Sequence, residues 1–409
     1  MMISEPLVNA ENNTSALSIF NDRHPLWQLS FRAFFLAASL FSVVAVALWV
    51  GSLSGLSFAS PITAKALYLS SLVWHAHEMI FGFAATVAIG FILTAVQTWT
   101  SSPSISGRPV MALVAIWVMV RALLWYNTIS SLAFAIALQS LWWLAIIGCY
   151  ARIVLRAKNK RNYLFIPLLS ALATVNLLVL GCGLAGKTDL AVHFTRSAVL
   201  IFTLVMAVVG GRVIPFFTVR GAGTEPTQPL PWLEMALLPV AIAGITIFIL
   251  GQFISLPITP ALFMLSAGIL HLVRCARWSG RKTLNVPLLW SLHLAYLLMS
   301  LGLIALGLSY LTPMVQFSAA LHIITIGAIG LIIIAMMSRV SLGHTGRALI
   351  TKRRINLAFY LVAAAALIRF ILPHLGYTLL SWQLSALLWG IAFSLFFFTY
   401  WPILTKPRQ

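Results

Sequence analysis

The chain has 409 residues, of which 61% are hydrophobic and only 8% are charged, and its mean hydropathy is +0.99. Soluble domains carry about 25% charged residues, so this composition excludes a soluble globular protein and indicates an integral membrane protein. The formal net charge of +19 does not indicate a nucleic-acid-binding surface, because the cations lie in loops between apolar segments and not on one polar domain.

Apolar segments of about 20 residues each follow one another along the chain, and this length crosses a bilayer as a helix. A helix satisfies its backbone hydrogen bonds internally, as lipid requires. We therefore predict an all-α, polytopic membrane protein with about twelve transmembrane helices. The predicted spans are 33–53, 66–96, 110–127, 131–155, 164–185, 191–217, 232–252, 258–277, 285–309, 315–339, 355–374 and 378–402.

The N-terminal segment, residues 1–30, is polar and lacks the apolar core of a signal peptide, so we expect it to stay in the cytoplasm. With this end inside, the outer loops contain only Lys65 and Lys187, whereas the inner loops and helix ends contain most of the other lysines and arginines. This asymmetry follows the positive-inside rule. It places both termini in the cytoplasm and agrees with an even number of spans.

An offset of four helices relates several parts of the sequence. Spans 2, 6 and 10 each carry a histidine near the outer end, namely His77, His193 and His322, and each finishes in a polar, basic stretch at the inner end. Spans 4 and 8 both leave through a basic loop and are followed by a span that begins near a proline. Either the chain contains an internal repeat, or short apolar strings resemble each other by chance.

The repeat predicts three four-helix units, residues 31–158, 159–283 and 284–404, within one membrane domain that covers residues 1–409. The units would surround a common axis, with the histidines of spans 2, 6 and 10 around it. This arrangement is similar to that of the catalytic subunit of haem–copper oxidases in helix count and histidine placement alone, which is an analogy of fold and not of function.

Span 2 contains the motif VWHAHEMIFG, residues 73–82, which places two histidines and a glutamate in an apolar helix. His75 and His77 are about 200° apart on a regular helix, so they face nearly opposite sides and do not readily share one metal ion. Glu78 follows His75 by three residues and is expected on its face, where it could orient the imidazole, bind a cation or accept protons. Hydrogen bonding between helices is the alternative role for this cluster.

His193 and His322, taken singly, would be core histidines. Together with His77 at a similar depth, they form a possible set of nitrogen ligands for haem iron or copper. His293 on span 9 is followed three residues later by Tyr296 on the same face, and this pair is a candidate cofactor site or proton relay.

His344 lies in the turn VSLGHTGR at the cytoplasmic end of span 10, where it is a metal ligand, a proton entrance or solvated surface. Three further histidines near span ends are expected to be exposed at the interface: His24, His271 and His374.

Three arginines lie within the outer halves of predicted spans: Arg121, Arg196 and Arg369. Either their long side chains snorkel to the membrane surface, or they bind an anionic group inside the protein. Arg196 follows His193 by one helical turn. Such a pair suits a haem, because the iron takes an imidazole and the propionates bind arginine through bidentate hydrogen bonds.

Three blocks of sequence resemble the signature blocks of the NnrS family, over nearly the whole chain: WHAHEMIFGF from Trp74, GGRVIPFFT from Gly210 and LHIITIGAIGLIIIAMMSRVSLGHTGR from Leu321. The resemblance implies a bacterial inner-membrane protein with twelve spans that contains haem and copper and responds to nitric oxide and nitrosative stress. The motif residues that it implies are His75, His77, Glu78, Arg212, Pro215, His322, Arg339, His344 and Arg347.

The leading hypothesis is a haem protein that binds or converts nitric oxide or a derivative. Haem b would lie between spans 2 and 10, held by His322 and either His75 or His77, and His193 with the remaining histidine of the first motif would hold copper. Glu78 and Tyr296 are the candidates for proton transfer, and an unidentified electron donor and membrane lipids are the expected partners. The oxidase analogy is incomplete, because span 7 has no histidine.

The alternative hypothesis is a multispan transporter of a metal–nitrosyl or another small substrate. It would use the intramembrane histidines and Glu78 as a substrate or proton path.

Overall fold

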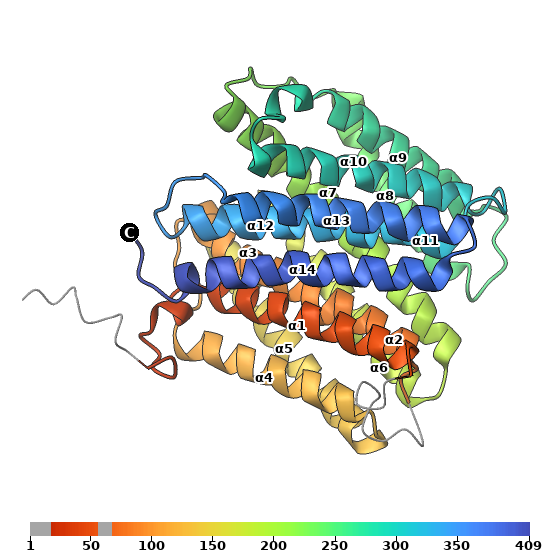
Figure 1. Cartoon of the computed structure of the whole chain (residues 1–409), viewed down its shortest axis with the longest axis horizontal. Coiled ribbons are helices and arrows are strands. Elements are labelled where there is room, and N and C mark those ends of the chain that lie inside the picture. Colours follow the sequence, from red (N-terminus) through yellow and green to blue (C-terminus); the bar gives the residue numbers. More distant parts are fainter. Residues whose placement is uncertain (1–17, 56–67) are drawn as a thin grey trace, which may run out of the picture.

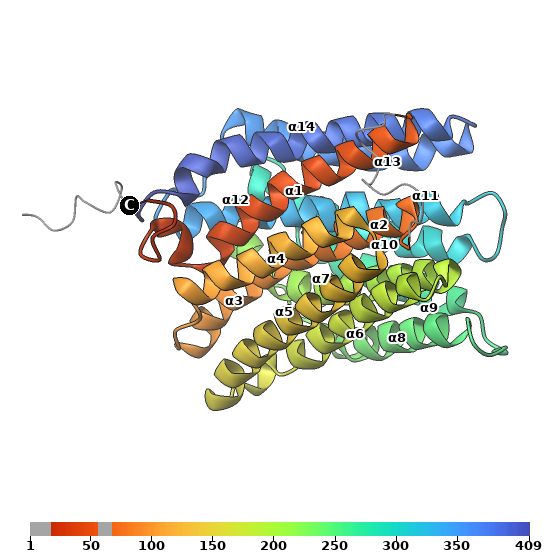
Figure 2. The same cartoon turned by 90° about the horizontal axis from the view of Figure 1, so that it is seen from below.

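The computed structural model describes residues 18–55 and 68–409, and within these ranges the chain is all-α. Most of the expected N-terminal segment (residues 1–17), Lys65 and the first two residues of the second predicted span lie outside the described residues. The helices run side by side with their long axes roughly aligned (Figures 1 and 2). The prediction of an all-α, polytopic membrane protein is confirmed.

Ten spans are single helices: α1 (Ser30–Leu53), α4 (Arg108–Tyr126), α5 (Ile129–Arg156), α6 (Phe165–Leu184), α7 (Thr188–Ala222), α8 (Pro231–Leu250), α9 (Pro260–Ala276), α10 (Pro287–Leu308), α13 (Arg353–His374) and α14 (Thr378–Leu404). Short 3-10 helices precede or connect them: η3 (Pro25–Trp27), η6 (Lys160–Asn162) and η7 (Gly280–Thr283). In the described part of the chain, eleven helices are long and apolar enough to cross a membrane, and α9 is a shorter apolar helix.

The other two spans are continuous helices interrupted by a π-helical segment. Span 2 consists of α2 (Ser71–His77), η5 (Glu78–Ala84) and α3 (Ala85–Thr100), and span 10 consists of α11 (Phe317–His322), η8 (Ile323–Gly330) and α12 (Leu331–Gly343). In both spans the π-helical segment begins immediately after a histidine of a sequence motif. A π-helical segment turns the residues that follow it relative to a regular helix, and such segments are frequent at functional sites.

α7 is longer than its predicted span of residues 191–217. It has 35 residues and continues past Pro215, although a proline inside a helix usually kinks or ends it. A proline is tolerated inside a membrane helix where neighbouring helices and local adjustments satisfy the freed backbone groups. At about 1.5 Å per residue the helix is about 52 Å long. This length exceeds the thickness of a bilayer's apolar layer, about 30 Å, and the last turns of the helix carry Arg212 and Arg220.

Local sequence signals explain several helix ends. The side chain of Thr128 accepts a hydrogen bond from Ser131 N and forms a capping box at the start of α5. Asn127, which ends α4, has the left-handed φ of 53° that asparagine tolerates. Its side-chain amide binds both backbone groups of Leu69, at 2.9 Å and 2.8 Å, and so connects the end of α4 to the chain just before span 2.

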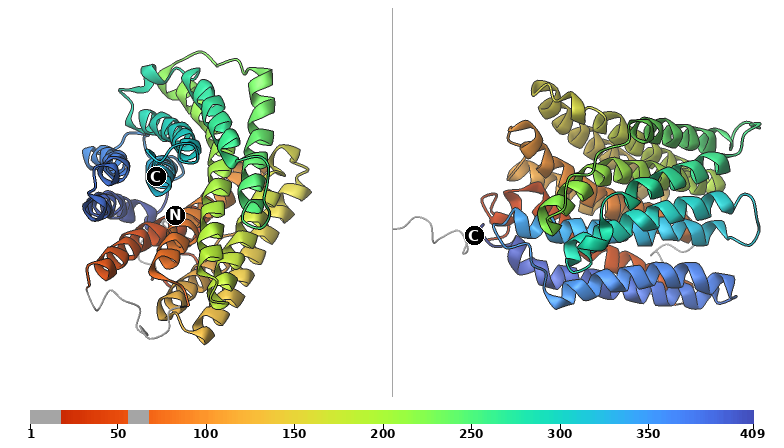
Figure 3. Two further views of the ribbon diagram at one scale, coloured as in Figure 1. Left: turned by 90° about the vertical axis from the view of Figure 1, so that its right-hand side faces the viewer. Right: turned by 90° about the horizontal axis from the view of Figure 1, so that it is seen from above.

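The centre of the protein is formed by spans 2 and 10 together with α7 and α10. In the most apolar windows of span 2, span 10 and α10, 78%, 72% and 72% of the residues are buried, against 22% in α8. Viewed along the helices, α13 and α14 (blue) lie on one side, and α5 and α6 lie on the opposite side (Figures 2 and 3). The helices that carry the sequence motifs are therefore the enclosed ones.

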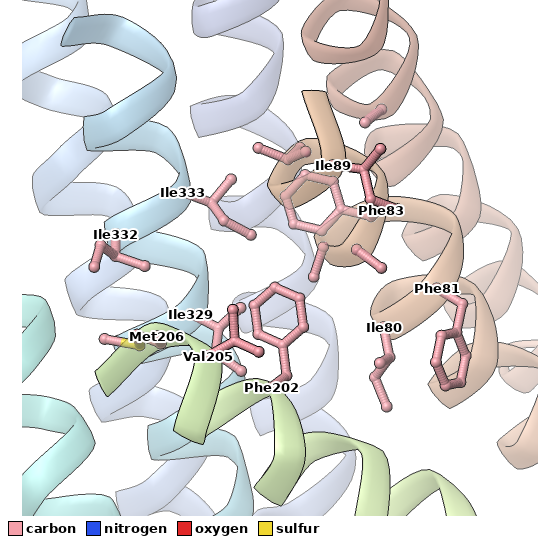
Figure 4. Close-up of a cluster of buried hydrophobic side chains, with 14 of the residues drawn as sticks. Ile80, Phe81, Phe83, Ile89, Phe202, Val205, Met206, Ile329, Ile332 and Ile333 are labelled. Atoms are coloured by element: carbon pink, nitrogen blue, oxygen red, sulfur yellow. The ribbon is translucent and has the colours of Figure 1, made fainter. Parts of the chain in front are cut away.

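Spans 2, 6 and 10 meet in one apolar cluster. Ile80, Phe81 and Phe83 of η5 and Ile89 of α3 lie beside Phe202, Val205 and Met206 of α7 and beside Ile329, Ile332 and Ile333 of span 10 (Figure 4). In lipid such contacts stabilise the structure through close packing and not through exclusion of water. The expected division into three four-helix units remains a prediction.

Asn127 provides a test of this fold. Replacing it with glycine keeps the left-handed backbone conformation but removes both hydrogen bonds to Leu69, whose backbone groups are then buried without partners. We expect Asn127→Gly to lower the free energy of unfolding by about 1–3 kcal/mol, measured by denaturation in detergent. Asn285→Gly is the control, because Asn285 is exposed in a loop. Equal stability of the two variants would contradict the role of Asn127.

Candidate functional site

A cavity of about 370 Å³ lies between α1, span 2, α7, span 10, α13 and α14. His75 of α2 and His322 of α11 both line it, although 247 residues of sequence separate them. Both side chains are half-buried, and the cavity accounts for their exposed surface. Most other lining groups are aliphatic or aromatic. We call this space the histidine cavity.

The hydrogen bond of His322 determines which of its ring nitrogens is free. Its Nδ1 lies 2.6 Å from the backbone carbonyl oxygen of Ser318, one turn earlier on α11. A carbonyl oxygen only accepts, so Nδ1 carries the proton and Nε2 keeps its lone pair. This is the arrangement in which metal-binding histidines are usually held.

His75 is held by stacking. Its ring lies 3.9 Å from the indole ring of Trp49 on α1, at an interplanar angle of 17°. Its Nδ1 is buried and has no hydrogen-bond partner within residues 18–55 and 68–409. A buried polar atom without a partner costs about 1–3 kcal/mol, so such an atom beside a cavity favours a ligand there.

Two arginines line the same cavity without a counter-ion. Arg369 of α13 donates to Ser318 Oγ at 3.2 Å, and its guanidinium lies over the ring of Trp382. Arg196 of α7 lies 4.8 Å above the ring of Phe317. Neither forms an ion pair with a carboxylate in the described part of the chain. Arg369 is buried and Arg196 is exposed, and both lie on the wall of the cavity without a carboxylate partner. Two such positive charges beside an apolar cavity favour an anionic ligand.

The indole N–H groups around the cavity also favour a ligand that accepts hydrogen bonds. Three tryptophans that line it have a buried Nε1 without a hydrogen-bond partner among the described residues: Trp49, Trp382 and Trp389. These groups are donors only. A ligand that carries acceptor atoms would therefore satisfy both the indole donors and the arginines.

His77 faces away from this cavity, in agreement with the expected opposition of His75 and His77. Its Nδ1 lies 2.8 Å from Glu78 Oε1, and its Nε2 lies 3.0 Å from the amide nitrogen of Asn176 on α6. The carboxylate accepts and the amide nitrogen donates, so both ring nitrogens of His77 are occupied. Of the two histidines in the first motif, only His75 is placed to share a ligand with His322.

The expectation that Glu78 would lie on the face of His75 is wrong. The carboxylate contacts His77 on one side and Arg121 of α4 on the other, with Arg121 Nη1 3.2 Å from Glu78 Oε2. The regular-helix geometry behind the expectation ends at Glu78, where the π-helical segment begins. The buried guanidinium of Arg121 also attracts the carboxylate.

Arg121 is paired inside the protein and does not snorkel to the membrane surface. Besides Glu78, it binds Gln139 Oε1 of α5 at 2.9 Å, and only 7% of the residue is exposed. Gly82 makes room for this pair, because a Cβ there would lie 2.6 Å from Arg121 Nη1 and 3.0 Å from Glu78 Oε2. Arg121 therefore does not reach the histidine cavity.

His193 does not line the histidine cavity and so does not share it with His322. Val192, Thr195 and Arg196 of α7 line the cavity, whereas the ring of His193 stacks on Phe248 of α8 at 4.8 Å. Arg196 therefore accompanies His322 and His75 in the cavity, and not His193. The described residues contain no group of three or more His, Cys, Asp or Glu side chains that could hold a metal ion. The expected copper site at His193 and a histidine of the first motif stays a prediction.

His344 lies at the other end of span 10, next to the ring of Phe31. Burial, followed by the positive charges of Arg408 and Arg32, lowers the pKa of His344 and favours its neutral form. Arg347 donates to the backbone oxygen of Thr345, two residues before it.

The remaining motif arginines hold the inner ends of the helices. Arg212 donates to Asn162 Oδ1 at 2.9 Å, and the guanidinium of Arg339 lies 3.7 Å above the ring of Phe217. These contacts connect α7 to its neighbours and are not part of the histidine cavity.

The expected pair of His293 and Tyr296 is divided between two environments. His293 Nε2 lies 2.8 Å from the hydroxyl of Thr218 on α7, whereas the Tyr296 hydroxyl contacts His271 and Arg274 of α9. Neither residue lines the histidine cavity.

The expected exposure is wrong for two of the three histidines near span ends. His271 is only 3% exposed, because Tyr296 of a neighbouring helix covers and binds it. His24 is 8% exposed and accepts a hydrogen bond from Leu26 N, and burial together with the charge of Arg32 lowers its pKa. His374 is exposed, as expected. Position relative to a span end does not reveal partners that come from other helices.

Comparison with known proteins gives one result for nearly the whole chain. A family model described as NnrS protein matches residues 25–408. The matched range includes all three motifs and every residue of the histidine cavity. No curated protein matches the chain.

The pair of Glu78 and Arg121 gives a testable prediction for stability. Arg121→Leu leaves a buried carboxylate without its partner, so we expect the free energy of unfolding to fall by about 3–5 kcal/mol. The double variant Glu78→Leu, Arg121→Leu removes both charges and should recover most of this loss. Denaturation in detergent measures all variants.

Arg108→Leu is the matched control, because Arg108 pairs with Asp22 at the surface and its side chain is 88% exposed. Surface ion pairs contribute little to stability. If Arg121→Leu were as stable as Arg108→Leu, the internal pairing of Arg121 would be contradicted.

Proposed function

The chain belongs to the NnrS family, whose members are membrane proteins related to the nitric oxide response, and we propose that it binds haem b in the histidine cavity and acts on nitric oxide or a derivative there. The observation that carries the proposal is the meeting of two imidazoles and two unpaired guanidinium groups in one enclosed cavity. We further propose that the protein lies in the bacterial inner membrane with both termini in the cytoplasm, in agreement with the distribution of its lysines and arginines.

The residues of the cavity suit haem in three respects. His322 presents the free Nε2 that an axial ligand needs, and His75 supplies a second imidazole without a partner of its own. Arg196 and Arg369 would neutralise the two propionates through charge-assisted hydrogen bonds. The aromatic and aliphatic side chains in the rest of the lining would surround the apolar macrocycle. When bound, haem supplies an iron that takes up nitric oxide or exchanges an electron.

The two histidines differ in how firmly they are held. His322 is anchored by its hydrogen bond to Ser318, whereas His75 is held by stacking on Trp49 alone. We therefore propose that both imidazoles would hold the haem, with His322 as the more firmly positioned residue and His75 as the less firmly positioned one. Copper at His193 stays a prediction, and the present proposal concerns haem alone.

The transporter alternative receives less support. It requires Glu78 and the histidines to line a common path, but Glu78 and His77 are fully buried and bind each other away from the cavity. Glu78 and Tyr296, the candidates for proton transfer, do not line the histidine cavity, so we assign neither a catalytic role there.

Substitution of the histidines tests the assignment of haem ligands. We expect His322→Ala to lose most of its haem, and His75→Ala to keep haem but show the absorbance spectrum of iron with one imidazole. Haem content per protein and the Soret band of the purified protein measure both effects. His193→Ala is the control and should match the native protein, because His193 packs against α8. Unchanged haem content and spectrum in His322→Ala would rule out the assignment.

Substitution of the arginines tests the orientation of the haem. Arg196→Met and Arg369→Met each remove a charged hydrogen-bond partner worth about 1.5–3 kcal/mol, so haem should bind roughly 10- to 150-fold more weakly. Haem dimethyl ester lacks the propionate charges, and its affinity should change little. Arg281→Met, in the 3-10 helix η7 where Arg281 is exposed, is the control. Equal losses of affinity for haem and for its ester would contradict the contact between arginine and propionate.

A further inference from the structure

The second sequence motif, GGRVIPFFT, is not explained by the histidine cavity. Its two glycines face α9 and α10 instead. A Cβ at Gly210 would lie 3.1 Å from the ring of Tyr296, and a Cβ at Gly211 would overlap the guanidinium of Arg274. The glycines therefore admit two large polar side chains against α7. These side chains belong to a group of four residues that we call the tyrosine cluster, in which His271 and Tyr296 are buried and the ion pair is partly exposed: Glu234, His271, Arg274 and Tyr296.

The hydrogen bonds of the tyrosine cluster determine its proton positions. Arg274 donates to Glu234 Oε1 at 2.8 Å and to the hydroxyl oxygen of Tyr296 at 3.2 Å. His271 Nδ1 lies 2.8 Å from the same hydroxyl. Arginine has no acceptor atom, so the hydroxyl accepts from Arg274 and its own proton goes to His271 Nδ1. His271 therefore carries its proton on Nε2.

A second, smaller cavity of about 30 Å³ adjoins His271 between α7, α8, α9 and α10. It shares no lining residue with the histidine cavity. Its walls are aliphatic or aromatic apart from His271 and Thr203, and the Thr203 hydroxyl already donates to Val199 O at 2.7 Å. The imidazole of His271 lines this cavity and its Nδ1 is occupied. The cavity is therefore apolar with one available donor, the Nε2–H of His271.

The size and chemistry of this cavity select its ligand. It has about twice the space that one water molecule needs, but its polar groups are only the Nε2–H of His271 and the acceptor oxygen of Thr203, the minimum of the two to four partners that a buried water has. It provides no free charge for an ion, because Arg274 is paired with Glu234. α8, which forms one wall, is the least enclosed of the long helices described, so the cavity lies close to lipid, in which uncharged gases dissolve.

We propose that this cavity is a second ligand site, which binds one small, uncharged gas molecule and orients it through the Nε2–H of His271. The site is independent of the proposed haem, since it uses different residues. The proposal gives the second motif a role. Gly210 and Gly211 leave room for Tyr296 and Arg274, and the hydrogen bonds of these two side chains keep the proton of His271 on Nε2.

Crystals pressurised with xenon test the occupancy of the site. We expect a xenon atom between α7, α8, α9 and α10 in the native protein. Ala241→Leu extends a side chain into the cavity and should abolish the peak, whereas Ala243→Leu, on the same helix but outside the lining, should keep it. The absence of xenon from the native protein would overturn the proposal, as would a chain of ordered waters or a lipid acyl chain in the cavity.

The infrared stretch of dissolved nitrous oxide tests the donor. We expect native protein and His271→Gln, which keeps an N–H donor, to show a bound band shifted from that of nitrous oxide in hydrocarbon. His271→Phe should move the band to the hydrocarbon position, and an unchanged band in this variant would overturn the role of His271. Neither probe needs haem, so the His322→Ala protein should give the native results even if the proposed haem site fails its own test.

Discussion

An ionisable side chain inside a membrane protein needs a partner, and the pairing of Glu78 with Arg121 is the contact on which the geometry of span 2 depends. The carboxylate is held between Arg121 and His77, where Gly82 makes room for the guanidinium. With His77 occupied on this side by Glu78 and Asn176, His75 is left on the opposite side of the helix, where it stacks on Trp49 and faces the histidine cavity. Helical geometry places the two histidines on opposite sides, and the contacts of the buried ion pair identify His77 as the structural one.

The same requirement distinguishes four arginines of the membrane helices from one another. Arg121 and Arg274 each bind a glutamate, so their charges are compensated within the protein. Arg196 and Arg369 contact only aromatic rings and a serine hydroxyl, and both line the histidine cavity. Inside a membrane protein, an arginine without a carboxylate beside it is stabilised when an anionic ligand neutralises its charge. The compensated arginines therefore support the fold, and the uncompensated ones indicate where the ligand lies.

The three sequence motifs converge on two places in the fold. The first and third motifs supply His75 and His322 to one cavity. The π-helical segment η5 begins directly after His77, and η8 begins directly after His322. The second motif supplies the glycines against which Tyr296 and Arg274 pack. α7 separates the two sites, since Val199 and Phe202 face the histidine cavity whereas Leu200 and Thr203 face the smaller one. A single long helix can therefore hold two ligand sites apart.

Composition and the length of the apolar segments determined the fold class, because lipid permits few ways to satisfy the backbone. Helical spacing also determined that His75 and His77 face apart, since this depends on local geometry alone. Helical spacing predicted the wrong neighbours for Glu78 and His193, and closeness to a span end wrongly predicted that His271 is exposed. A π-helical segment and partners from distant helices decide the orientations of these residues. Which histidines share a cavity, and which arginines lack a counter-ion, are relations between helices far apart in the chain, so only the tertiary structure decided them.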